Sequence, residues 1–196
     1  MSVPAAFYFD LRSPEAYLAA ERALALLPAP CEWLPIDSAI LAHAETFEAH
    51  RCEQEAVAMR ESFERRAAAL GLQPWRWPEP FPFDSEVAML AATYAKRIGK
   101  TVAFALAAFR QAFAGGRALS DTDTVLIAGA ACEIHPSAIL RAIGTRTVRA
   151  DLERASALAL SLGVPDVPAV RVGDRILVGE PALEEAGALL AAARRR

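Results

Sequence analysis

Residues 5–17, AAFYFDLRSPEAY, contain the transition that decides the fold. The run AAFYF (5–9) is apolar and too short for a helix, so it predicts a buried strand that ends at Asp10. The tripeptide SPE (13–15) then has the order of an N-cap, a first-turn proline and an early acid, which predicts that a helix begins here. Apolar residues at helical spacing continue this helix up to Pro28.

Short strands are also expected on either side of a long central region. EWLPI (32–36) predicts a second strand, and its proline favours an edge position or an early end. Near the other end of the chain, the alternating segments 169–172 and 175–178 predict a hairpin that turns at Gly173-Asp174. An amphipathic helix is expected to follow over 181–193.

The central region has the composition of helices. From about 46 to 161, Ala, Leu, Glu and Arg dominate and runs of β-branched residues disappear. Glycines and prolines divide the region, and the helices expected between them span 46–70, 84–98, 101–114, 121–132, 136–143 and 147–162.

The order of these elements predicts an α/β fold. A β-α-β half and an α-β-β-α half, separated by a helical region, form the layout of a thioredoxin-like fold with a large all-helical insertion. We therefore expect a thioredoxin-like domain over 1–40 and 160–196, and a helical insertion domain over 41–159.

Composition and charge exclude several classes of function. Of the 196 residues, 54% are hydrophobic and 23% are charged, which excludes a natively unfolded chain. The net charge of −3 does not favour nucleic acid or an anionic membrane surface as a partner. No apolar stretch approaches the roughly 20 residues that cross a bilayer, and the N-terminus lacks the basic start of a secretory signal. We expect a cytoplasmic protein.

Three cysteines, Cys31, Cys52 and Cys132, stand at wide spacings without a CxxC pair. This pattern argues against a disulfide framework and favours a reducing compartment. His43 and His50 lie near Cys52, but their spacing scatters the side chains around a helix, so no metal site is predicted.

Ser13 stands where the first strand passes to the first helix, at the edge where open α/β sheets bind ligands. Two interpretations stay open: a pure helix cap, or a hydroxyl that donates a hydrogen bond to a thiolate stabilised by the helix N-terminus. The segment before Pro168 also has two interpretations: a turn with two prolines, or a cis bond between Val167 and Pro168. In this fold the cis bond would turn the Val167 backbone outward beside Ser13, where an extended peptide can pair with it.

The loop PWRWPEPFP (74–82) has too many prolines for a helix or a strand. It carries Trp75 and Trp77, for which two interpretations also stay open. These side chains either cover the insertion or line a hydrophobic substrate pocket.

Three of these segments resemble one family in their order along the whole chain. FYFDLRSPEAYLAAERALALLP (7–28) resembles the opening of 2-hydroxychromene-2-carboxylate isomerases and kappa-class glutathione transferases. GLQPWRWPEPFPFDS (71–85) resembles their aromatic, proline-rich segment, and LGVPDVPAVRVGDRILVGEPAL (162–183) resembles their Val-Pro, hairpin and final helix. The resemblance implies the DsbA-like branch of the thioredoxin superfamily.

The resemblance implies a glutathione-dependent isomerase, or a related glutathione transferase, that acts as a homodimer on small aromatic electrophiles. Ser13 takes the position of the family's catalytic serine, and Val167 with Pro168 that of the pair that binds the cysteinyl part of glutathione. Glu180 is expected at the glutamyl end, and Asp166 replaces the family's usual glycine, where its charge would lie near an anionic ligand. The substrate-binding side chains implied are Arg12, Tyr17, Trp75 and Trp77; Arg12 would pair with a carboxylate of the substrate or of glutathione.

Two other functions stay open. Ser13 and Ala16 stand where disulfide-exchanging relatives carry cysteines, so dithiol exchange at these positions is disfavoured. One alternative is a non-catalytic DsbA-like binding protein that keeps the groove. The other is a thiol oxidoreductase without a CxxC motif that uses Cys31 or Cys132.

Overall fold

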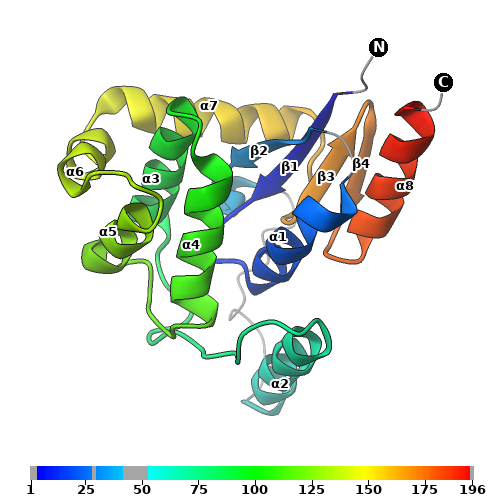
Figure 1. Cartoon of the computed structure of the whole chain (residues 1–196), viewed down its shortest axis with the longest axis horizontal. Coiled ribbons are helices and arrows are strands. Elements are labelled where there is room, and N and C mark those ends of the chain that lie inside the picture. Colours follow the sequence, from blue (N-terminus) through cyan, green and yellow to red (C-terminus); the bar gives the residue numbers. More distant parts are fainter. Residues whose placement is uncertain (1–3, 28–29, 42–52, 195–196) are drawn as a thin grey trace.

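The computed structural model describes residues 4–27, 30–41 and 53–194. Four strands form one mixed sheet in the order β2-β1-β3-β4 (Figure 1). The strands are β1 (Ala5–Phe9), β2 (Glu32–Pro35), β3 (Ala169–Val172) and β4 (Arg175–Val178). β1 runs parallel to β2 and antiparallel to β3. β2 therefore lies at an edge, as its proline predicts.

The helices agree with the expected spans to within a few residues at each end, except that residues 46–52 of the first central helix lie outside the described residues. They are α1 (Pro14–Leu26), the 3₁₀ helix η1 (Ser38–Ile40), α2 (Glu53–Ala69), α3 (Glu86–Arg97), α4 (Thr101–Phe113), α5 (Thr122–Ala130), α6 (Pro136–Ile143), α7 (Arg146–Ser161) and α8 (Ala182–Arg194). The expected hairpin turn at Gly173-Asp174 is present, and Gly173 has a φ of 60°, which glycine adopts without strain. The expected α/β order, with a helical region between β2 and β3, is thus present.

Strand β1 is buried on both faces of the sheet. Phe7 and Phe9 belong to the large hydrophobic cluster that also contains residues of α1, α3 and α4. Ala6 and Tyr8 point the other way and pack with Ala159 of α7. Because alternate residues of a strand point to opposite faces, a strand covered on both sides is apolar throughout, which explains the run AAFYF.

The helical part packs directly onto the sheet. One hydrophobic cluster extends from Phe7 in β1 to Phe104 in α4 and Ile139 in α6. Figure 1 shows α3 to α6 gathered beside the sheet, with α2 below α1 and α4. The division into 1–40 with 160–196 and an insertion over 41–159 therefore stays a prediction. No helix in the described part of the chain combines the length and the apolar character needed to cross a membrane.

Candidate functional site

The register of β1 fixes what surrounds its carboxyl end. Phe9 lies opposite Pro35 of β2, and Tyr8 lies opposite Ala169 of β3. Pro168, which precedes β3, therefore lies on one side of the end of β1, and the turn after β2 lies on the other side. The residues that connect β1 to α1 lie between these two neighbours.

Ser13 is half-buried and caps α1. Its Oγ accepts a hydrogen bond from the Ala16 N–H at 3.1 Å, and its own backbone N–H donates to the Asp10 carbonyl at 3.1 Å. A serine hydroxyl can accept and donate at the same time. Among the described residues no acceptor is recorded for the Ser13 proton. The capping role is therefore compatible with donation to a ligand.

The Val167–Pro168 peptide bond is cis, as expected. The Val167 N–H donates to Asp166 Oδ1 at 2.7 Å. The Pro168 carbonyl accepts from the Gly179 N–H at 2.8 Å, which joins this segment to the end of β4. Asp166 thus occupies the backbone donor that an extended peptide ligand would use.

Asp10 joins the carboxyl end of β1 to η1 and to the start of α3 through hydrogen bonds, and the sequence analysis did not identify it. The side chain is fully buried and accepts hydrogen bonds from the Ser38 N–H (3.1 Å), the Ser38 hydroxyl (2.9 Å) and the Ser85 hydroxyl (2.9 Å). Arg12 donates its backbone N–H at 3.1 Å and forms an ion pair with Asp10 at 3.5 Å. Burial of a carboxylate requires such partners. An acid directly after five apolar residues is the signal that could have identified it.

Arg12 lies next to Ser13 in the chain and is held in place by its neighbours. Its Nε and Nη2 donate to Ser38 Oγ at 3.3 and 3.0 Å. A guanidinium has five N–H donors, so several remain without a recorded acceptor in the described part of the chain. Asp10 already balances the charge of Arg12. The pairing of Arg12 with a ligand carboxylate stays a prediction.

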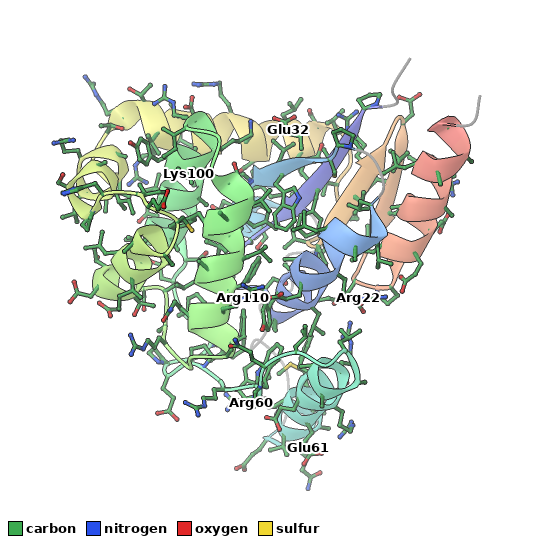
Figure 2. The ribbon with its side chains drawn as sticks, viewed as in Figure 1. Arg22, Glu32, Arg60, Glu61, Lys100 and Arg110 are labelled. Atoms are coloured by element: carbon green, nitrogen blue, oxygen red, sulfur yellow. The ribbon has the colours of Figure 1, made fainter. Side chains whose placement is uncertain are left out.

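Glu180 is buried in a charge network rather than open to a ligand. Its carboxylate forms ion pairs with Arg22 and, at 3.0 Å, with Arg66. Its backbone N–H donates to Glu15 Oε1 at 3.1 Å. Figure 2 shows Arg22 between α1 and α8, where it also pairs with Glu184 and lowers the pKa of that carboxyl. A glutamyl group that bound to Glu180 would have to compete with these partners.

The structure brings Tyr17, Trp75 and Trp77 into one aromatic cluster. Trp75 lies 5.5 Å from Tyr17, 5.2 Å from Trp77 and 5.1 Å from Phe113 between ring centres. Trp77 Nε1 donates to Glu64 of α2 at 2.9 Å. This packing supports the interpretation that Trp75 and Trp77 cover the helical region, between α2 and the core. A role in substrate binding stays a prediction for these three side chains.

Tyr17 is nearly inaccessible, and its pKa is raised to about 12, chiefly by burial and secondly by the charge of Glu21. Arg110 acts in the opposite direction. Figure 2 shows Arg110 on α4 close to α1, where it pairs with Glu21. The phenol is therefore neutral at physiological pH.

The described cysteines are free thiols with raised pKa values. Burial, helped by Glu32, raises the pKa of Cys31 to about 12, and burial raises that of Cys132 against the effect of Lys100. Because the thiolate is the nucleophile, the raised pKa values disfavour attack by either thiol. Cys31 also precedes β2, at the end of the sheet remote from Ser13. Cys52, His43 and His50 lie outside the described residues.

Comparison with known proteins adds a family and several structural relatives. The family described as DSBA-like thioredoxin domain matches residues 6–191. No curated protein matches the sequence.

The similar solved structures include an isomerase and oxidoreductases. A 2-hydroxychromene-2-carboxylate isomerase has a TM-score of 0.84 at 18% identity, covering 97% of this chain and 96% of its own. A probable DsbA oxidoreductase from Streptomyces coelicolor has a TM-score of 0.79 at 20% identity, covering 99% and 91%. The cytosolic disulfide reductase DsbM from Pseudomonas aeruginosa, solved with GSH, has a TM-score of 0.65 at 15% identity, covering 98% of each chain. At these identities the likeness shows the fold.

Proposed function

Since the chain belongs to the DSBA-like thioredoxin domain family, we propose that it is a glutathione-dependent isomerase, or a related glutathione transferase, acting on small aromatic electrophiles. One observation carries this proposal. The Ser13 hydroxyl, whose proton has no recorded acceptor among the described residues, caps α1 after the carboxyl end of β1, and the neighbouring strand β3 begins directly after the cis-proline Pro168. Neither Ser13 nor Ala16 is a cysteine, so this position offers hydrogen bonding in place of disulfide exchange.

The residues around Ser13 fit the thiol end of glutathione. When bound, glutathione supplies the sulfur nucleophile, which adds to the electrophile and, in an isomerisation, leaves again. The Ser13 hydroxyl donates to the thiolate, and the positive end of α1 stabilises that charge by about 0.3 to 2 kcal/mol. Such a stabilisation lowers a thiol pKa by at most about 1.5 units. A thiol is then ionised more readily at neutral pH.

The groove beside Val167 fits the peptide backbone of glutathione less completely. The Val167 carbonyl is an acceptor for a ligand N–H, whereas the Val167 N–H is already bonded to Asp166. Glu180 is engaged by Arg22 and Arg66. We therefore expect the affinity for glutathione to depend on displacement of the Asp166 carboxylate.

The thiol oxidoreductase alternative has less support. The raised pKa values of Cys31 and Cys132 oppose attack by either thiol.

The structural likeness to DsbM, which was solved with GSH, supports a glutathione ligand in this fold. The occupied Val167 N–H and the engaged Glu180 carboxylate are the observations that favour a non-catalytic binding protein, and turnover distinguishes it from an enzyme.

The decisive experiment is calorimetric titration with glutathione, combined with assays on aromatic electrophiles. We expect Ser13→Ala to lower turnover by about a hundredfold, the size of effect seen when one transition-state donor is removed. Ser13→Thr should retain most of the activity because it keeps both the hydroxyl and the cap.

Thr145→Ala provides the control for capping alone, since Thr145 caps α7 through the Val148 N–H. It should cost about 1 kcal/mol of stability without an effect on turnover. Absence of binding at millimolar glutathione would sink the proposal and favour a binding protein. Reduction of a protein disulfide by the unaltered chain would favour the oxidoreductase.

A homodimer and a cytoplasmic location form part of the same proposal. The resemblance implies the former, and the cysteine pattern of the sequence favours the latter. Light scattering coupled to gel filtration tests the dimer directly, and a mass of 21.0 kDa would contradict it.

A further inference from the structure

A cavity of about 430 Å³ lies between η1, the start of α3 and the middle of α7. Its volume falls within the range of small-molecule sites. Met89 and Leu152, which are almost fully buried, and Ile40 supply its apolar surface. The cavity is therefore large enough and apolar enough for a single aromatic ring with substituents.

The cavity lies on the opposite side of the β1 end from Pro168. Its lining includes Asp37, which follows closely after β2, and Ser85, whose hydroxyl donates a hydrogen bond to Asp10. Pro168 lies on the β3 side of the same strand end. Arg12 lines the cavity and precedes Ser13 in the chain. A molecule in this cavity and a thiol along Val167 would thus approach the connection between β1 and α1 from two sides.

The charges around the cavity oppose an anion. Its lining contains two arginines and four carboxylates, so that its formal charge is −2. Arg149 forms an ion pair with Glu86, and the charge of Glu153 acts on it as well. Arg12 is paired with the buried Asp10. A ligand carboxylate would find both cations already balanced and excess negative charge nearby.

Arg12 still offers hydrogen bonds. Its guanidinium is fixed by Ser38, and donors that do not bond Ser38 remain at the edge of the cavity. An uncharged oxygen, such as that of a carbonyl or nitro group, can accept from these donors without bringing a full negative charge.

We propose that this cavity binds an uncharged aromatic compound through a carbonyl or nitro oxygen, and that it discriminates against carboxylates of the same shape. The inference deepens the proposed function by naming the class of its electrophile, and it rests on that function for the role of the ligand as substrate. The occupancy of the cavity can be measured without a thiol.

Methionine-methyl NMR tests the proposal. Met89 lines the cavity, whereas Met59 lies on α2, so the two methyl groups serve as reporter and control. We expect 4-nitroacetophenone to shift the Met89 signal saturably without glutathione and to leave Met59 unchanged. 4-Nitrobenzoate, its carboxylate counterpart, should bind at least about tenfold more weakly, which corresponds to about 1.4 kcal/mol.

A charge variant separates electrostatics from shape. Glu153→Gln should strengthen 4-nitrobenzoate binding roughly twofold to fivefold and leave 4-nitroacetophenone unaffected, in line with the size of exposed charge interactions. Glu133→Gln, which removes an exposed carboxylate that does not line the cavity, should change neither affinity.

The outcomes distinguish the two proposals. Three results would overturn the cavity proposal: an unshifted Met89 methyl signal, equal shifts of the Met89 and Met59 signals, or 4-nitrobenzoate binding as tight as that of 4-nitroacetophenone. A saturable Met89 shift in a protein that neither binds nor uses glutathione would support the cavity and overturn the proposed function.

Discussion

Asp166 illustrates how one side chain can change a binding groove. Its carboxylate accepts the Val167 N–H at 2.7 Å, next to the cis-proline. The bond satisfies a backbone donor that the fold leaves at the groove, and its charge lies where an anionic peptide would run. Both effects weaken a ligand that pairs with Val167.

Replacing Asp166 should therefore increase the affinity for glutathione. One hydrogen bond is worth about 1 kcal/mol net, so we expect Asp166→Gly to lower the dissociation constant about fivefold in calorimetry. Asp166→Asn removes the charge but keeps an acceptor, and should give a smaller gain. Asp174→Asn, at the hairpin turn, controls for net charge and should have no effect. Weaker binding to the glycine variant would show that Asp166 helps the ligand.

At the scale of elements, α2 is attached to the rest of the molecule by a few specific contacts. Arg66 pairs with Glu180 and, at 3.7 Å, with Glu15. Phe63 stacks on Trp75 at 5.7 Å between ring centres. Because Glu180 is buried, loss of Arg66 leaves Arg22 as the arginine that pairs with its carboxylate among the described residues.

We expect Arg66→Ala to loosen α2 selectively. Hydrogen exchange in α2 should accelerate by an amount equivalent to about 1.5 to 3 kcal/mol, the usual contribution of hydrogen bonds to charged groups, while exchange in β1 stays unchanged. Arg65→Ala is the matched control, because Arg65 is exposed and, within the described part of the chain, its ion pair is with Glu61 on the same helix. Equal acceleration in both variants would contradict the proposed attachment.

The elements were largely predictable from sequence because their signals are local. The SPE start of α1, the Gly173 turn and the proline at the edge of the sheet each depend on a few adjacent residues. The site was predictable only in part. Asp10 meets Ser85 across 75 residues, and Glu180 meets Arg22 across 158 residues. Neither pairing leaves a periodic pattern, and the orientation of Asp166 depends on a side-chain rotamer.

At the scale of the whole molecule, the aromatic cluster around Tyr17 links three parts of the fold. Tyr17 of α1 stacks on Phe113 of α4 at 5.6 Å and contacts Trp75 of the proline-rich loop. Its burial keeps the phenol in the neutral form. Ionisation therefore opposes the packing of all three parts together.

Stability should decrease in alkali for this reason. The pKa of Tyr17 is raised to about 12 in the folded protein from 10.0. The stabilisation is fully present below pH 10 and is lost as the pH rises toward 12, since the unfolded state ionises first. Two units correspond to about 2.7 kcal/mol.

Urea unfolding at pH 9 and pH 12 tests this expectation. Tyr17→Phe should lose less stability over this interval than the unaltered chain, and the difference isolates Tyr17 from Cys31, whose pKa is also raised to about 12. An identical pH dependence of the two proteins would refute the assignment.

The central position of β1 has a consequence for synthesis on the ribosome. One of its neighbours, β2, emerges soon after it, but β3 begins only at Ala169. Until then, one edge of an entirely apolar strand lacks its hydrogen-bonded neighbour, although α1 and the central helices can already cover one of its faces. The sheet is therefore completed only after most of the polypeptide has been translated, and the nascent chain depends on those helices to shield this apolar strand.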